Sequence, residues 1–155
     1  MTGRARAEAK ATIGARTDAV YEVIADYRTH HPNIMPPSLF SRIEVESGGT
    51  GAGTTFHITM HLAGTKKRMR MRVAEPDPGR VLTETNLDTG IVTAFEVTPA
   101  NGDGATLARI SSDWETARGI RGLFDRVATP PLMRWIFGKQ LRQLARYMTS
   151  GRAPT

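Results

Sequence analysis

Carboxylates are the side chains of this sequence best suited to acid–base chemistry, and strand parity separates them. Glu84 shares its parity with Leu82 in a stretch that alternates as a β-strand does, so the pattern points its side chain inward. A buried carboxylate beside an apolar pocket has a raised pKa and can act as an acid or a base. Glu96 and Asp113 lie opposite the apolar residues of their own stretches, which predicts solvent exposure. Glu84 is therefore the best catalytic candidate, although the sequence alone assigns no catalytic residue.

The partners that a catalytic carboxylate would need are not evident. Arg109 has outward parity by the same test, so it is not placed to stabilise an oxyanion in the interior. No set of nucleophile, base and orienting residue stands out.

The four histidines do not form a metal site. His57 and His61 share one face of a strand, but a separation of four residues places them about 13 Å apart. His30 and His31 are adjacent and precede a proline, a context that favours helix capping or a surface position. The chain has no cysteine, which excludes disulfides, thiol catalysis and cysteine-ligated metals. We expect neither a metal nor another cofactor.

Two stretches raise the question of an anionic partner. The glycines of residues 48–53 precede a strand, whereas a phosphate cradle needs a helix N-terminus, so they indicate a turn. The alternating run 66–73 puts Lys66, Arg68, Arg70 and Arg72 on one face, without aromatic residues that could stack on bases. Both patterns disfavour nucleic acid as a partner. The net charge of +6 would also suit an anionic membrane or an acidic partner. One hypothesis is therefore an interaction module that binds such a partner through the basic strand or the last helix.

Hydrophobic periodicity predicts the elements that position these residues. Apolar residues between Val20 and Tyr27 recur at helical spacing, and Thr17 or Asp18 offers an N-cap. Prolines at positions 32, 36 and 37 end that helix. Period-two alternation, with turns between, predicts strands at 6–14, 39–46, 55–62, 66–73, 80–86, 91–98 and 105–115.

The chain closes with a helical stretch from about Arg118 to Met148. Its first part carries one apolar stripe from Ile120 to Val127, and the pair Pro130-Pro131 then marks a kink or a new start. Because an antiparallel sheet alone leaves one face in water, the longer helix that follows is placed to cover it. Incomplete cover would leave a cavity between sheet and helix.

Composition fits a soluble globular protein. Hydrophobic residues make up 39% of the 155 positions and charged residues 23%. No stretch approaches the roughly 20 apolar residues of a transmembrane helix, and the start lacks the apolar core of a secretory signal. We expect a single domain over residues 1–155, a cytoplasmic location, and a monomer or homodimer.

Several motifs resemble the START-like, helix-grip superfamily (SRPBCC), and within it the polyketide cyclase/dehydrase-like group. They are AVYEVIAD at 19–26 followed by His31-Pro32, the glycine-rich turn at 48–54, the turn at 75–80, and FEVTP at 95–99. The resemblance covers residues 7–149, the core of the expected domain. It implies an α+β fold in which a curved antiparallel β-sheet wraps around a long C-terminal helix, with short helices after the first strand. These motifs lie at turns and core positions, so they indicate a fold rather than a reaction.

The resemblance also implies a deep pocket between sheet and helix, and strand parity predicts its lining. The predicted ligand-binding residues are Phe56, Ile58, Met60, Met69, Met71, Thr93, Phe95, Ile110, Trp114 and Phe124. The leading hypothesis is the binding of a hydrophobic or aromatic small molecule, lipid or polyketide-like. The alternative is a cyclase/dehydratase-type lyase that uses inward polar groups such as Glu84, Thr93 and Asn86. Because the inward positions are mostly apolar, binding is favoured, and enzymatic activity stays open.

Overall fold

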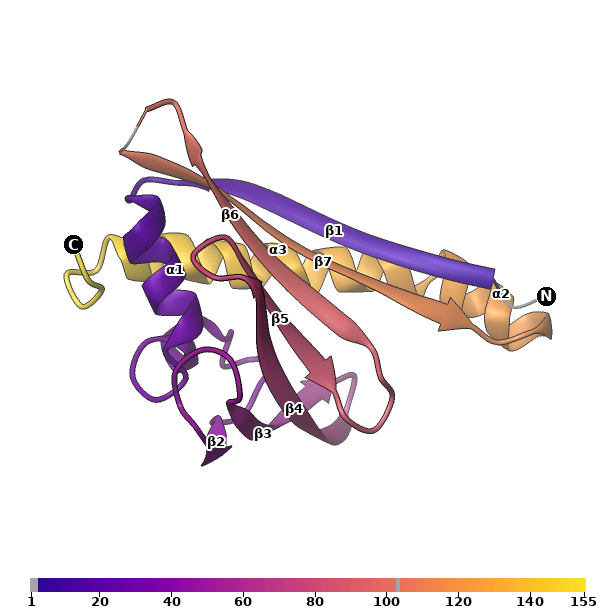
Figure 1. Ribbon diagram of the computed structural model, residues 1–155. Helices are drawn as coiled ribbons and strands as arrows, with labels where there is room; N and C mark the ends of the chain where they lie inside the picture. Colours follow the sequence, from indigo (N-terminus) through magenta and orange to yellow (C-terminus); the bar gives the residue numbers. More distant parts are fainter. Residues whose placement is uncertain (1–2, 103) are drawn as a thin grey trace.

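One antiparallel sheet of seven strands dominates the structure (Figure 1), a computed structural model that describes residues 3–102 and 104–155 and, of Phe124, the backbone only. The strand order is β1-β7-β6-β5-β4-β3-β2. The strands are β1 (Gly3–Ile13), β2 (Glu44–Ser47), β3 (Thr55–Leu62), β4 (Thr65–Asp77), β5 (Val81–Asn86), β6 (Val92–Ala100) and β7 (Ala105–Thr116). The helices are α1 (Thr17–Ala25), the 3-10 helix η1 (His31–Ile34), α2 (Gly119–Val127) and α3 (Thr129–Met148). The predicted α+β fold is confirmed.

Strands β2 to β7 pair with their neighbours in sequence, and β1 is the edge strand beside β7. β3 and β4 pair from Thr55↔Arg72 to Leu62↔Thr65. The two residues between them, Ala63 and Gly64, have φ of 50° and 76°, the left-handed pair that a tight type I′ hairpin requires. β1 pairs with β7 along its whole length, although the two strands are about a hundred residues apart in sequence.

Helix α3 covers one face of this sheet, which we call the inner face. It runs lengthwise behind β1 and β7 in Figure 1, with α1 at its C-terminal end and α2 at the opposite end. Pro130 and Pro131 stand at its first turn, as expected for a new helical start after α2. Its buried residues recur at helical spacing and face the sheet: Ile136, Phe137, Gln140, Leu141, Leu144 and Tyr147.

Two local predictions were wrong. The N-cap of α1 is Arg16, because the Thr17 side chain instead lies 3.1 Å from the Thr106 hydroxyl on β7. The strand expected at 39–46 is reduced to β2 and an isolated bridge between Phe40 and Met60 of β3, since the backbone N–H groups of Leu39 and Phe40 donate to the carbonyl of Pro36. Both side chains are buried, so the alternation expected of a strand fails there.

The glycine-rich segment is a turn, as predicted, and the protein's own carboxylate occupies it. Glu75 accepts hydrogen bonds from the Ala52 backbone N–H at 3.1 Å and from the Tyr21 hydroxyl at 2.8 Å. Gly51 has a φ of +64°, and a Cβ there would lie 2.6 Å from a Glu75 oxygen. This contact ties the turn to α1 and β4.

Candidate functional site

A cavity of about 420 Å³ lies between the inner face of the sheet and α3. Five strands, β3 to β7, form its floor, and α3 forms its roof with residues that include Met133, Ile136 and Phe137. Most of its lining is aliphatic, aromatic or methionine side chains. A volume of this size is within the range of pockets that hold small organic ligands.

Eight of the ten predicted ligand-binding residues line this cavity. They are Phe56, Ile58, Met60, Met69, Met71, Thr93, Phe95 and Trp114. Ile110 is buried but does not line the cavity; it pairs across the sheet with Ala9 and Phe95 and fills the core there. The side chain of Phe124 lies outside the part of the chain that the structure describes. That these residues bind a ligand stays a prediction.

A short polar row crosses the otherwise apolar inner face. Glu84, Thr93 and Ser112 are direct cross-strand partners on β5, β6 and β7, and all three line the cavity. Asn86 lies two residues further along β5 and is also buried in the lining. The inward direction that strand parity gives Glu84 is therefore what the structure shows.

Two of these polar groups already serve the sheet. The Ser112 hydroxyl donates to the Val92 carbonyl at 2.8 Å. The Asn86 side-chain oxygen accepts the backbone N–H groups of Asp88 and Thr89 at 2.9 and 3.2 Å, which fixes the turn between β5 and β6. Glu84 and Thr93 are consequently the groups best placed to meet a ligand.

Glu84 is held from behind by an aromatic cluster. The Tyr27 hydroxyl donates to Oε1 of Glu84 at 2.5 Å, and Nε2 of His31 lies 3.4 Å from the same oxygen. The Tyr27 ring stacks between His31 and Phe56, with ring centroids 4.2 and 4.8 Å away. Since Glu84 lines the cavity and only Oε1 is engaged by this cluster, Oε2 is the oxygen that a ligand can reach.

The tautomer of His31 fixes where protons reside in this cluster. Its Nδ1 lies 2.6 Å from the Ile24 carbonyl, which can only accept, so Nδ1 carries the proton. In the neutral ring Nε2 is then an acceptor, and it has no hydrogen-bond partner although it is fully buried. Two acceptors, Nε2 and a carboxylate oxygen, face each other unless one proton is shared between them.

Burial determines which charges this cluster tolerates. Loss of solvent raises the pKa of Glu84 to about 7, and the hydrogen bond from Tyr27 offsets part of that rise. The same burial lowers the pKa of His31 to about 4, against the opposing effect of the Ile24 carbonyl. Below neutral pH the pair is therefore a carboxylic acid beside a neutral imidazole and not an ion pair. Burial and the nearby Glu84 also raise the pKa of Tyr27 well above its usual value, so it remains a donor.

The sequence analysis missed His31, which was expected in a capping or surface position. It is instead completely buried, because the chain turns after α1 and η1 begins at His31, which places the ring against Tyr27 and Glu84. One signal was available: positions 20, 24, 27 and 31 continue the spacing of the apolar helical stripe through the histidine. His30, by contrast, has Nδ1 2.7 Å from the Tyr147 hydroxyl, so the two neighbours do point apart.

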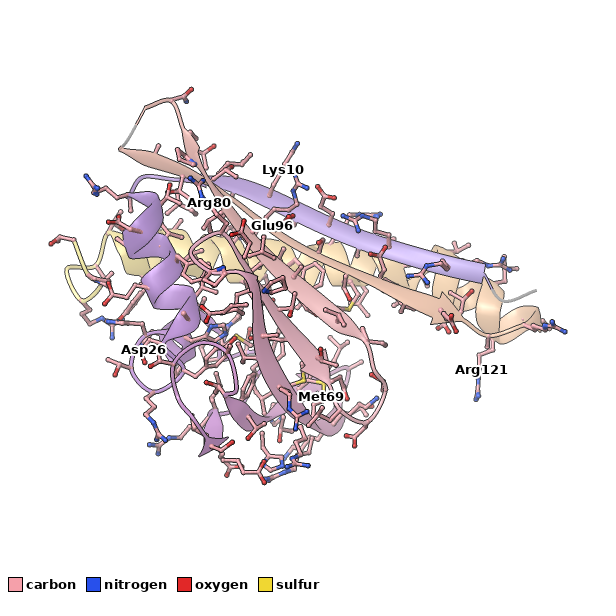
Figure 2. All side chains as sticks on the ribbon, viewed as in Figure 1. Lys10, Asp26, Met69, Arg80, Glu96 and Arg121 are labelled. Atoms are coloured by element: carbon pink, nitrogen blue, oxygen red, sulfur yellow. The ribbon has the colours of Figure 1, made fainter. Side chains whose placement is uncertain are left out.

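The remaining candidates lie on the outer face or far from the cavity. Arg109 sits between Glu8 and Glu96, at 3.4 Å from each, and Asp113 pairs with Arg6 at 2.9 Å. Glu96 and Lys10, both labelled in Figure 2, are the cross-strand partners of Arg109 on either side of β7, so the three residues share one face of the sheet. The predictions of outward-facing Glu96, Asp113 and Arg109 are confirmed.

The basic run on β4 also faces solvent. Arg68 and Arg70 reach across β3 to Glu44 and Glu46 at 3.0 and 2.9 Å. Within residues 3–102 and 104–155, no three side chains of histidine or acidic type gather as they would around a metal ion. No helix in these ranges is both long and apolar enough to cross a membrane.

Comparison with known proteins places this geometry in a family. A sequence profile described as "Polyketide cyclase / dehydrase and lipid transport" matches residues 4–149. The chain belongs to this family, within the START-like, helix-grip superfamily. A search of proteins with curated functions returned no match.

Solved structures share the fold over almost the whole chain. The KanY protein is 27% identical with a TM-score of 0.79, covering 94% of this chain and 97% of its own. The Zhui aromatase/cyclase from a Streptomyces species is 18% identical with a TM-score of 0.76, covering 96% and 98%. Truncated norcoclaurine synthase from Thalictrum flavum is 15% identical with a TM-score of 0.71, covering 96% of both chains. At these identities the last two likenesses concern the fold alone.

Proposed function

We propose that this protein binds a hydrophobic or aromatic small molecule in the cavity between the sheet and α3. The observation that carries the proposal is the cavity itself, about 420 Å³ in volume and lined mainly by apolar side chains. An engineered apolar cavity of about 150 Å³ accommodates benzene, so this one has room for about three fused rings or a folded acyl chain. The lining methionines can adapt to either shape.

Glu84 is a polar group in this mostly apolar cavity and can hydrogen-bond to a ligand. A neutral carboxylic acid both donates and accepts, so the reachable Oε2 suits a hydroxyl or carbonyl group on the ligand. An anionic group beside Glu84 would meet an uncharged or negative carboxyl group, because Lys67, the basic residue among the lining residues, is exposed and lies near the hairpin end of β4. We therefore expect a neutral ligand with one oxygen near the polar row.

Tryptophan fluorescence tests binding directly. Trp114 lines the cavity and Trp135 is exposed, and the chain has two tryptophans. In a Trp135→Phe protein, phenanthrol should therefore quench or shift the emission of Trp114 at micromolar concentrations, and hexadecanol, a neutral lipid-like alcohol, provides the lipid arm. An unchanged spectrum with both probes up to their solubility limits would contradict the proposal.

A matched pair of variants separates cavity binding from surface adsorption. Thr93 faces the cavity from β6, and Thr83 on β5 is also half-buried but has the opposite parity. Thr93→Phe places a ring in the cavity and should weaken probe binding at least about tenfold. Thr83→Phe should leave binding unchanged, because its ring lies on the other face.

A second candidate function is a cyclisation or dehydration of a polyketide-type substrate, and Glu84 is the observation that favours it. An ionised Oε2 can take a proton from the carbon beside a ketone and deliver it to the departing hydroxyl, which leaves as water while a carbon–carbon double bond forms. With a pKa near neutrality Glu84 can perform both steps. Thr93 lies across from it and can position the ketone.

Dehydration of a β-hydroxy aryl ketone, followed by mass spectrometry, tests this second function. Glu84→Gln should lower turnover about 100-fold or more while keeping phenanthrol binding. Glu96→Gln, the same change on the outer face, should have no effect. Equal rates in the two variants would remove Glu84 from any reaction.

A further inference from the structure

Three apolar side chains of α2, Ile120, Leu123 and Val127, face solvent and not the sheet. Ile120, Leu123 and Val127 are 89%, 56% and 65% exposed, and Leu132 and Trp135 at the start of α3 are 36% and 47% exposed. We call these five residues the α2–α3 patch. Helical periodicity predicts an apolar stripe on α2. These three side chains are nevertheless far more exposed than the core residues of α3.

The surroundings of the patch are strongly basic. Residues 118–139 contain five basic side chains, Arg118, Arg121, Arg126, Arg134 and Lys139, and one acidic side chain, Asp125. Lys139 places its ammonium group 4.9 Å from the centre of the Trp135 ring. Figure 2 shows the Arg121 side chain projecting freely from α2. This short segment therefore carries most of the chain's net charge of +6.

The patch borders the cavity. Asp125, Thr129 and Met133 belong to the same two helices and line the cavity from that end. Ile91, which is 37% exposed, lines it from the turn between β5 and β6, and its neighbour Val92 is 40% exposed. Exposed apolar side chains therefore stand on both the helical and the sheet side of the cavity rim.

We propose that the α2–α3 patch docks on the surface of an anionic membrane, with the cavity rim turned toward the lipid. Aliphatic residues and a tryptophan interleaved with arginines are the composition of a helix that lies in a membrane interface. Each basic residue near an anionic surface strengthens such binding about fivefold. A hydrophobic ligand could then pass between lipid and cavity without crossing water.

Charge decides among the possible occupants of the patch. A second copy of the chain would bring five basic residues against five, which repel each other. An acidic protein would satisfy the charge, but aliphatic side chains that protrude from a short helix suit insertion among lipid headgroups better than contact with a charged protein surface. The passage of a ligand from the membrane rests on the proposed function of the cavity. Docking itself can be tested independently, because it needs no ligand in the cavity.

Sedimentation with vesicles tests the docking. Wild-type protein should bind phosphatidylcholine vesicles containing about one-third phosphatidylglycerol at about 0.15 M salt, and bind pure phosphatidylcholine vesicles much less. In a Trp114→Phe protein, the emission of Trp135 should shift to the blue on anionic vesicles. No binding to anionic vesicles, or equal binding to both kinds, would overturn the proposal.

Paired variants locate the contact. Arg121→Gln with Arg134→Gln should weaken vesicle binding about 10- to 30-fold, whereas Lys66→Gln with Arg72→Gln removes the same charge from β4 and should change it less than about threefold. Leu123→Ser with Val127→Ser should weaken it at least about tenfold through lost apolar insertion. Equal losses in the two charge pairs would overturn the proposal, as would a dimer in ultracentrifugation that the serine variant abolishes.

The same vesicle assay separates this inference from the ligand proposal. Thr93→Phe, which fills the cavity, should bind anionic vesicles like the wild type. The serine variant of the patch should still bind phenanthrol in solution. If either variant loses both ligand binding and vesicle binding, the two activities do not use separate sites. Circular dichroism identifies a variant that has lost both because it is unfolded.

Discussion

Two tyrosine–glutamate pairs hold α1 and the segment after it to the sheet, and they differ in what they leave free. Tyr21 donates to Glu75 at 2.8 Å, and Tyr27 donates to Glu84 at 2.5 Å. In the first pair the second carboxylate oxygen accepts the Ala52 N–H, so the protein engages both oxygens. In the second pair His31 shares the oxygen that Tyr27 already holds, and the other oxygen is left to the cavity.

This difference separates a structural carboxylate from a candidate functional one. Glu75 closes the glycine-rich turn and has no oxygen left for a ligand. Glu84 is buried, lines a mostly apolar cavity, and has a neutral imidazole where a stabilising cation would normally stand. Such incomplete satisfaction of a buried group costs stability, and proteins concentrate it at binding and catalytic sites.

The largest expected effect is on the pH dependence of stability. Because the pKa of Glu84 is raised to about 7 in the folded state, the wild type loses the contribution of its neutral acid as pH rises from about 4.5 through 7. Glu84→Gln has no proton to lose, so its free energy of unfolding relative to wild type should rise by up to about 3 kcal/mol over that range. His31 is present in both proteins, and its effect cancels in the difference.

Urea unfolding at a series of pH values measures this difference. The gain of the variant should level off above about pH 7, where Glu84 is ionised in the wild type. Two curves that run parallel from pH 4 to 8 would show that Glu84 ionises as readily in the folded protein as in the unfolded chain.

A smaller effect should distinguish the two tyrosines. Tyr27→Phe removes a donor from a buried carboxyl group and should cost about 2 kcal/mol of unfolding free energy, with a further rise in the pKa of Glu84. Tyr21→Phe should cost about 1 kcal/mol, because Glu75 is partly exposed and keeps the Ala52 N–H. Thermal and urea unfolding measure both, and a larger loss for Tyr21→Phe would reverse the comparison.

The smallest expected effect concerns His31, whose imidazole chemical shifts should not change with pH over most of the range. His31 should remain neutral with its proton on Nδ1 from pH 8 down to about 5, since burial lowers its pKa to about 4. Nitrogen-15 spectra of the imidazole rings report the tautomer and the charge directly. Protonation of His31 near pH 6.5 would mean that it forms an ion pair with Glu84 and that the cavity has a charged wall.

Strand parity predicted most of the sheet side of the cavity and three of its polar groups, Glu84, Thr93 and Asn86. Glu84 and eight of the lining residues lie on faces that the alternation assigns, because one face of each strand is buried along its length. Parity gives the face but not the neighbours, so Ile110 has the right face and lies in the filled core. It also says nothing of residues outside strands, and His31 reaches Glu84 only through the turn after α1.

The apolar stripe of α2 shows a second limit of sequence patterns. Periodicity predicted the helix and its stripe from Ile120 to Val127, and the helix is present. The same periodicity would serve a helix that covers a core and one that meets a membrane, since both need one apolar side. Only the exposed fractions of these side chains distinguish the two, and they come from the fold.

The ionisation of Glu84, followed by carbon-13 NMR of its carboxyl group with and without phenanthrol, tests most directly whether an unsatisfied carboxyl group meets the ligand. The free protein should show a pKa of about 7 for this group, and phenanthrol should shift the Glu84 resonance and its titration while the Glu75 resonance stays in place. A Glu84 carboxyl that titrates at its ordinary value near 4.5 and ignores the ligand would contradict the assignment of this cavity and its polar end.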